Sequence, residues 1–349
     1  MSTAEFDLDT LLSNMELGNN SSVLSIDGSE SSSRRTIIPI SEYPGGIDPR
    51  LLDLSYSGLL NLHSCPRYFE LERKRTIYAE NQSEKATITF AFGHVVGAGI
   101  ASIFSGAPWE AVVWEAFLAW DAPLMAEDTK ADKSFWSALL ALQKFHYMRA
   151  SGFLSEYTVL QYNGKPAIEL GFRVSLPDNF VIRGYIDIVL QHQETKAIVV
   201  IEVKTTGLAT VNPATYKNSS QAIGYSIVLD VVAPEVSHYE VYYLVYKTKG
   251  QEFEIFPFTK TYTQRAQWIR SLLFDKQAIA LYSQENLFPM RGESCVQFFR
   301  DCKYLQTCQL STEYLTQPAA YEDLEREKEK VYEINLTLED LINSQLQKV

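Results

Sequence analysis

The first half of the chain carries apolar residues at helical spacing. They recur every three to four positions, a period that predicts helices rather than strands. Ser55 stands just before the first apolar run and is a favourable helix N-cap. The segments expected to be helical are 55–75, 90–104, 108–121 and 131–150.

Beyond residue 166 the hydrophobic period shortens to two, which is typical of β-strands. The run AIVVIEV, at 197–203, is almost continuously apolar, as expected for a central strand that is covered on both faces. The predicted strands are 167–176, 180–191, 196–206 (joined to the previous strand by a turn near Gln193–Lys196), 238–248 and an edge strand at 251–259. Helices are predicted at 218–230, 261–284 and 322–334. This order predicts an α/β fold with a mixed central β-sheet flanked by helices and preceded by a helical region.

The two ends of the chain differ in composition from the part between them. Residues 1–36 are rich in Ser, Asn and acids and are expected to form a disordered tail, and residues 311–349 a charged helical tail. The domain between them, 37–310, would include a helical insertion at about 105–152. Residues 1–35 carry a net charge of −4 and residues 311–349 carry −5, so −3 of the total of −12 remains for the rest. The acidity therefore argues only mildly against nucleic acid as a partner, because a nearly neutral body can hold a local basic groove.

No segment predicts secretion or membrane insertion. The first residues, MSTAEFDLDT, are acidic, whereas a secretory signal begins basic and then becomes apolar. The stretch 88–109 is apolar and has Gly93 and Gly97 at GxxxG spacing, but it contains His94 and lacks a basic flank, so we interpret it as a buried helix. We therefore expect a cytoplasmic protein, in a bacterial or virus-infected cell, with no membrane contact.

Two acids and a lysine interrupt the apolar strands. Asp187 lies late in one strand, and Glu202 and Lys204 lie two positions apart on the next, so that both point to one side. If the hairpin pairs as predicted, Asp187 faces Glu202. Converging carboxylates suit Mg²⁺ or Mn²⁺, and the lysine could hold a water or a phosphate. The alternative is a structural salt bridge between Glu202 and Lys204.

Five motifs along residues 55–308 resemble the RecB-like branch of the PD-(D/E)xK nuclease superfamily. In order, they are SYSGLLNLHSCPRYFE, FGHVVGAGI, GYIDIV, IEVKTTG and QAIGY, with His94 in the second and Gln221 and Tyr225 in the last. The QxxxY element following ExKT is the most specific part. Ile186 stands where many members have proline.

The resemblance implies a restriction-endonuclease-like core that hydrolyses phosphodiester bonds with Mg²⁺ or Mn²⁺. It implies that the metal is bound by His94, Asp187, Glu202 and the carbonyl of Val203 and that Lys204 positions the water. Gln221 and Tyr225 would contact the DNA strand or buttress Lys204, and Glu169 on the preceding strand would assist.

The four cysteines of the chain form a split set. Cys65 lies near the start of the expected domain, and Cys295, Cys302 and Cys308 fall within fourteen residues near its end. Spacing alone fits either Zn²⁺ or a 4Fe-4S cluster. The split resembles the iron–sulfur clasp of AddB-type and CRISPR-associated RecB-like nucleases, although the gap of six residues between Cys295 and Cys302 departs from their usual two.

The resemblance predicts a deoxyribonuclease that acts on DNA ends or single strands in recombination or repair, as an exonuclease or a single-strand-preferring enzyme of cellular or viral origin. No P-loop motif is present, so unwinding would need a helicase partner, and a recombinase partner is equally compatible. Two alternatives stay open: a catalytically silent DNA-binding or assembly subunit, and a CRISPR spacer-acquisition nuclease.

Overall fold

The computed structural model describes residues 47–74, 83–121, 131–236, 239–297, 300–310 and 330–346. The tail expected at 1–36 lies outside these residues, as does most of the tail expected at 311–349. Residues Ile40–Val349 form one compact unit. Within the described residues, no helix combines the length and the apolarity needed to cross a membrane.

Most helices appear where the period of 3.6 predicts them. The helices are α2 (Tyr56–Ser64), α3 (Pro66–Arg73), α4 (Ser83–Phe104), α5 (Trp109–Ala119), α6 (Phe135–Ala150), α7 (Ala214–Lys217), α8 (Ser220–Val232), α9 (Tyr262–Gln284) and α12 (Leu338–Leu346), with 3-10 turns η3 (Pro49–Leu51), η4 (Ala131–Lys133), η5 (Pro177–Asn179) and η6 (Gly292–Ser294). Ser55 is the N-cap of α2, and its side chain accepts a hydrogen bond from the amide of Gly58. The single helix predicted for 55–75 is wrong, because Pro66 forces Cys65 into an extended conformation and starts a second helix.

The strands form one mixed sheet and two short hairpins. They are β1 (Asp53–Ser55), β2 (Tyr157–Val159), β3 (Gln161–Tyr162), β4 (Lys165–Pro166), β5 (Ile168–Ser175), β6 (Val181–His192), β7 (Ile198–Thr206), β8 (Tyr239–Lys247), β9 (Glu252–Thr259), β10 (Val296–Gln297), β11 (Arg300–Asp301) and β12 (Ile334–Thr337). The main order is β12-β5-β6-β7-β8-β9, and β1 and β2 also pair with β6. The β7–β8 and β12–β5 pairs are parallel, while β5–β6, β6–β7 and β8–β9 are antiparallel. The predicted α/β fold with a mixed sheet is therefore confirmed, with β7 central and β9 at an edge.

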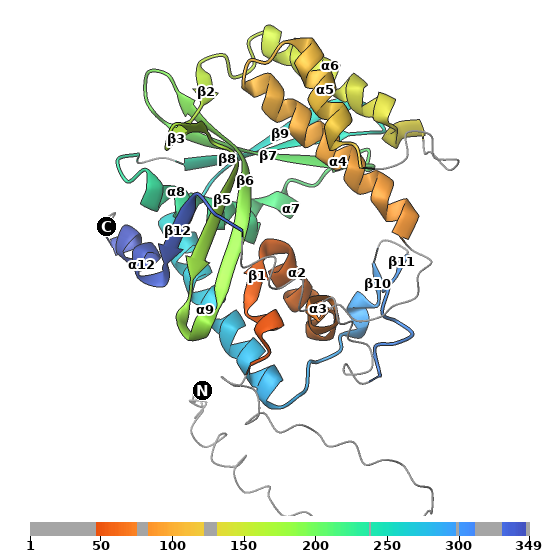
Figure 1. Cartoon of the computed structure of the whole chain (residues 1–349), viewed down its shortest axis with the longest axis vertical. Helices are drawn as coiled ribbons and strands as arrows, with labels where there is room; N and C mark the ends of the chain where they lie inside the picture. The colour runs from red at the N-terminus through yellow and green to blue at the C-terminus, as the bar shows by residue number, and fades with distance from the viewer. Residues whose placement is uncertain are drawn as a thin grey trace, which may run out of the picture. The chain divides into compact units, whose positions relative to one another are not determined.

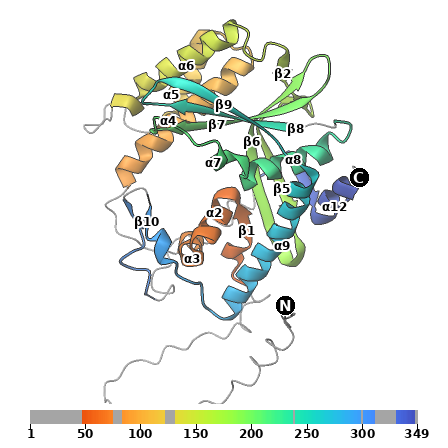
Figure 2. The ribbon, with the colours of Figure 1, turned by 180° about the vertical axis from the view of Figure 1, so that it is seen from behind.

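Helices cover the sheet on both faces (Figures 1 and 2). One hydrophobic core joins the sheet to α2, α8, α9 and α12, and a second joins the opposite face to α4, α5 and α6. Along β7, Ile198 and Val200 point into the first core, whereas Val199 and Ile201 point into the second. This double burial explains the continuous apolar run of β7.

The C-terminal segment is part of this architecture. β12 pairs in parallel with β5, and α12 packs against α8 and α9. Residues 330–333 are not helical, and Ile334 already begins β12, so the helix predicted for 322–334 is wrong at its end, while residues 322–329 lie outside the described part. The sequence did not predict this strand, because β12 has only four residues, of which two are buried, and it directly follows a highly charged segment.

Candidate active site

Asp187 and Glu202 meet where the β6–β7 ladder ends. The last paired residues are Ile188 and Ile201, and one further step of this antiparallel register brings Asp187 opposite Glu202. Asp187 Oδ2 accepts a hydrogen bond of 2.9 Å from the amide of Val203. The backbone amide of Val203 on β7 therefore holds the carboxylate of Asp187 beside that of Glu202, as the predicted hairpin pairing requires.

Lys204 is tied to both neighbouring elements. Its Nζ lies 2.5 Å from Glu202 Oε1 and 3.5 Å from Gln221 Oε1, which comes from α8. Gln221 in turn donates to the hydroxyl of Tyr225, and that hydroxyl donates to the carbonyl of Tyr185, two residues before Asp187. Tyr225 is fully buried, so its position suits a buttress for Lys204 rather than a surface contact.

His94 lies on α4, on the side of the site opposite to α8. Its side chain is 68% exposed, and its Nδ1 lies 3.8 Å from Asp121 Oδ2. In the part of the chain that the structure describes, no three His, Cys, Asp or Glu side chains form a ready-made metal-binding group. The structure thus brings Asp187 and Glu202 together and places His94 in the same cleft, without closing the expected set of ligands.

Glu169 completes a group of three acids, and its backbone is unusual. Its φ of 47° lies in the left-handed region, which costs a residue with a side chain free energy. Ile168 packs into one core and Leu170 into the other, although a regular strand would point both to the same face. On the paired strand β6, Ile186 and Ile188 likewise pack into opposite cores. Both strands therefore reverse the faces of their side chains at Glu169 and Asp187.

The acids perturb one another. Burial, and then the charge of Glu202, raise the pKa of Asp187 well above its usual value, although the Val203 amide opposes this. Burial and Glu202 also raise the pKa of Glu169, against the charge of His94. Burial disfavours the charged form of Lys204, but the charge and hydrogen bond of Glu202 outweigh it and raise the pKa of the lysine. The site therefore has an excess of negative charge that one lysine does not neutralise.

A cleft of about 1010 Å³ opens over these residues. Glu169, Asp187, Glu202, Val203, Lys204 and Gln221 line it on the side of the sheet and α8, and His94 lines it from α4. Every residue that was predicted for metal binding or catalysis reaches this cleft except Tyr225, which supports Gln221 from behind.

The sequence matches a known family over most of its length. The model of the PD-(D/E)XK nuclease superfamily matches residues 53–309, from β1 to the residue after the last cysteine. This chain belongs to the PD-(D/E)XK nuclease superfamily. No curated protein matches this nuclease with significant similarity.

Two solved structures are distantly similar to this PD-(D/E)XK nuclease. A protein described as a candidate exonuclease, from Eubacterium rectale, has 11% identity and a TM-score of 0.41, with 77% of this chain and 92% of that chain covered. The protein SSO0001 has 12% identity and a TM-score of 0.33, with 74% and 87% covered. Likenesses this distant carry no argument about substrate, so the family assignment rests on the sequence match.

PD-(D/E)XK nucleases generally use divalent metal ions, and the acids of this chain fit one. Glu202 is 1% exposed, and its Oε2 has no hydrogen-bond partner among the described residues. A buried carboxylate oxygen without a partner costs free energy, as does its repulsion of Asp187. A hard divalent cation held by these two carboxylates would offset both costs.

The four cysteines of this nuclease are free thiols, and among the described residues they do not form a ready-made metal-binding group. Burial raises the pKa of the Cys302 and Cys308 thiols, and the other cysteines of the set raise both further. Cys65 links α2 to α3, and its neighbour Ser64 accepts a 2.6 Å hydrogen bond from Ser294 on the C-terminal segment. The fold thus joins two segments that are more than 220 residues apart in the sequence.

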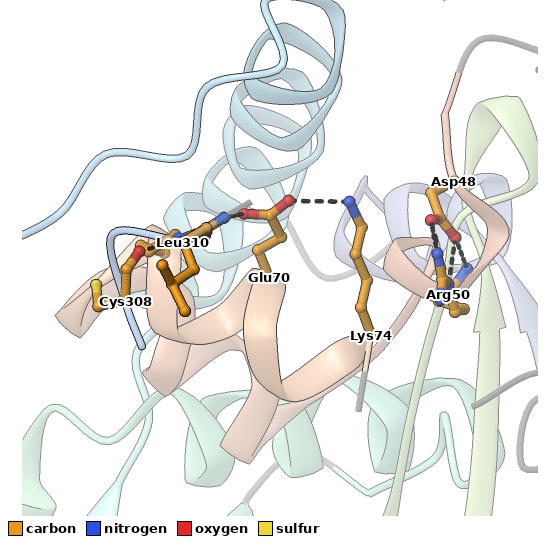
Figure 3. Close-up of polar contacts among 7 residues, drawn as sticks. Asp48, Arg50, Glu70, Lys74, Cys308 and Leu310 are labelled. Carbon is orange, nitrogen blue, oxygen red and sulfur yellow. Dashed lines mark hydrogen bonds and ion pairs between the residues drawn. The ribbon is translucent and has the colours of Figure 1, made fainter. Parts of the chain in front are cut away.

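One interaction that the sequence did not reveal holds these segments together. Arg67, two residues after Cys65, donates hydrogen bonds to the carbonyls of Cys308 and Leu310. Glu70 is 3% exposed and forms ion pairs with Arg67 and with Lys74. Figure 3 shows the Glu70–Lys74 pair next to Cys308 and Leu310. The separate ion pair of Asp48 with Arg50 lies near it. No spacing rule predicts these bonds, because their acceptors are backbone carbonyls 241 and 243 residues away.

Proposed function

We propose that this chain is a Mg²⁺- or Mn²⁺-dependent deoxyribonuclease of the RecB-like branch that acts on DNA ends or single strands, as an exonuclease or single-strand-preferring enzyme in recombination or repair. The observation that carries the proposal is the convergence, in one cleft, of Asp187, Glu202 with its unpartnered oxygen, and Lys204. Their spacing, their burial and the family match support the same assignment.

In this proposal Asp187, Glu202, the carbonyl of Val203 and His94 hold the metal. A bound divalent ion supplies Lewis acidity and lowers the pKa of bound water. Lys204 orients the water or the scissile phosphate and offsets the negative charge that develops there. Gln221 fixes Lys204 laterally, and Tyr225 fixes Gln221 through their 2.5 Å hydrogen bond.

The proposal includes a 4Fe-4S cluster held by Cys65, Cys295, Cys302 and Cys308, with Zn²⁺ as the alternative. Burial and the neighbouring cysteines raise the pKa of the Cys302 and Cys308 thiols, and a metal that binds thiolates would offset that cost. The cluster would act as a staple between α3 and the segment after α9, reinforcing the bonds of Arg67.

The test of catalysis uses end-labelled single-stranded and duplex DNA with Mn²⁺, Mg²⁺ or EDTA. We expect cleavage that EDTA abolishes and that Glu202→Gln lowers by at least about 100-fold, because the charge that holds the metal is lost. Glu194→Gln, on the exposed hairpin turn after β6, is the matched control. A Glu202→Gln enzyme as active as the control would refute the site. Metal-dependent DNA binding without cleavage by the wild type would favour the silent subunit.

The test of the cluster is the absorbance spectrum of anaerobically purified protein. A broad absorbance band at about 400 nm that disappears in Cys302→Ser would support a cluster. A colourless protein that contains stoichiometric zinc would overturn the cluster and leave the staple in place as a zinc site.

A further inference from the structure

The cleft continues along α4 far beyond the proposed metal site. One face of α4, together with Ser105 directly after the helix, lines the cleft from Thr89 onward at every third or fourth residue. At 1.5 Å per residue, these sixteen steps cover ~24 Å. His94 lies near one end of this face, so most of its length has no role in holding a metal.

The α4 face is hollow because its residues are small. Gly93, Gly97, Ala98 and Ala101 all line the cleft. A Cβ at Gly97 would meet nothing within 4 Å, whereas a Cβ at Gly99, on the buried side of the same helix, would come within 2.3 Å of Leu142 Cδ1. Packing therefore explains the glycine at Gly99 but not the one at Gly97. Glycine destabilises a helix relative to alanine, so the open space at Gly97 points to an external ligand.

The proposed metal site opens into this same cleft. Glu202 is 1% exposed and lines the cleft, and its Oε2 has no partner in the part of the chain that the structure describes. The small-residue face and the unsatisfied carboxylate therefore belong to one continuous space.

The dimensions of the cleft suit one strand of nucleic acid. The cleft of about 1010 Å³ extends for ~24 Å along the α4 face. A stacked strand advances about 3.4 Å per nucleotide, so several consecutive nucleotides fit along α4.

The end of the cleft near the metal site offers groups that bind nucleotides. Phe90 is 66% exposed, although it lines the cleft one helical turn before His94. Lys133 reaches the neighbouring residue, with its Nζ 3.4 Å from Thr89 Oγ1. An exposed aromatic ring stacks on any base, and a nearby lysine attracts the phosphate backbone.

We propose that the α4 face from Thr89 to Ser105 is the track of a single polynucleotide strand and that Phe90 stacks on the base next to the scissile phosphate. The proposal rests on the proposed nuclease function for the identity of its ligand. It assigns to Gly97 a steric role, which is to leave room for the strand.

The first experiment adds bulk to the track. Gly97→Leu is compared with Ala150→Leu, which adds a similar bulk at the exposed end of α6, outside the cleft. The readouts are the Kd for a fluorescein-labelled 20-nucleotide oligothymidylate by anisotropy in Ca²⁺, and the turnover of that strand relative to bis(p-nitrophenyl) phosphate in Mn²⁺. We expect Gly97→Leu to raise Kd, and to lower the turnover ratio, by at least about tenfold, and Ala150→Leu to change neither more than about twofold. A wild-type Kd for Gly97→Leu would overturn the proposal.

The second experiment tests the aromatic ring and protects against a Gly97→Leu protein that fails to fold. Phe90→Ala should raise the Kd for the single strand by about tenfold, and Phe90→Tyr should restore it, because stacking needs only the ring. A hairpin duplex should bind the wild type at least about tenfold more weakly than the single strand, and equal binding would refute a one-strand track. A wild type that binds the strand but cleaves nothing would refute the nuclease while leaving the track intact. A wild type that does not bind the strand would overturn the track, even if it hydrolyses bis(p-nitrophenyl) phosphate.

Discussion

Replacement of glycine by alanine should change the stability of the protein in opposite directions at two positions of α4, Gly97 and Gly99. Gly97 lies in the interior of the helix, and a Cβ there meets nothing within 4 Å. Gly97→Ala should therefore gain the full difference in helix propensity, about 0.8–1.0 kcal/mol in the free energy of unfolding. The same propensity gain applies at Gly99, but there the Cβ would come within 2.3 Å of Leu142 Cδ1 and 2.9 Å of its Cγ.

Leu142 is fully buried, so it cannot move aside freely. Overpacking of this kind costs about 1–3 kcal/mol, which exceeds or cancels the propensity gain and leaves Gly99→Ala destabilised by about 0–2 kcal/mol. Because the propensity gain is common to both variants, the difference between them isolates the steric cost, about 1–3 kcal/mol.

The assay is urea denaturation of the two variants and the wild type, followed by circular dichroism. Equal m-values would show that only stability has changed. A stabilised Gly99→Ala, or a Gly97→Ala less stable than the wild type, would refute the reasoning, because it would mean that the space around α4 is not as the structure has it.

Three further predictions concern contacts away from α4. Tyr225→Phe should lower the free energy of unfolding by about 1–3 kcal/mol, because the carbonyl of Tyr185 loses its buried hydrogen-bond donor. It should also slow DNA cleavage more than Glu194→Gln does. Urea denaturation and a cleavage assay measure the two effects, and an unchanged stability would contradict the prediction. Arg67→Met should loosen the cysteine-bearing segment and make it cut faster in limited proteolysis, with no change expected if the proposed cluster alone holds that segment. The hydrogen bond to Asp275 raises the pKa of His63. The stability that this pair contributes is therefore fully present below pH 6.5 and is lost as the pH rises through the raised pKa. Urea denaturation at a series of pH values should show this loss in the wild type but not in Asp275→Asn.

Local pattern in the sequence predicted most of the elements and the positions of the acids and the lysine of the proposed site. The change of hydrophobic period from 3.6 to 2 located the helices and β5–β9, because the side-chain directions of helices and strands follow from local backbone geometry. The spacing of Glu202 and Lys204 put them on one side of β7, where their side chains are in fact 2.5 Å apart. The i, i+4 spacing of Gln221 and Tyr225 is compatible with the hydrogen bond that they form on α8.

Only the tertiary structure decided features that depend on residues distant in the sequence. The left-handed backbone of Glu169 was not visible in the pattern, because strand pairing and packing overcome the local preference there. Burial and shape decide which distant segments come together. They bring Arg67 to Cys308, pair β12 with β5 and form the cleft along α4. A sequence reports which side chains share a face of one element, whereas the space between elements is fixed by how whole faces pack together.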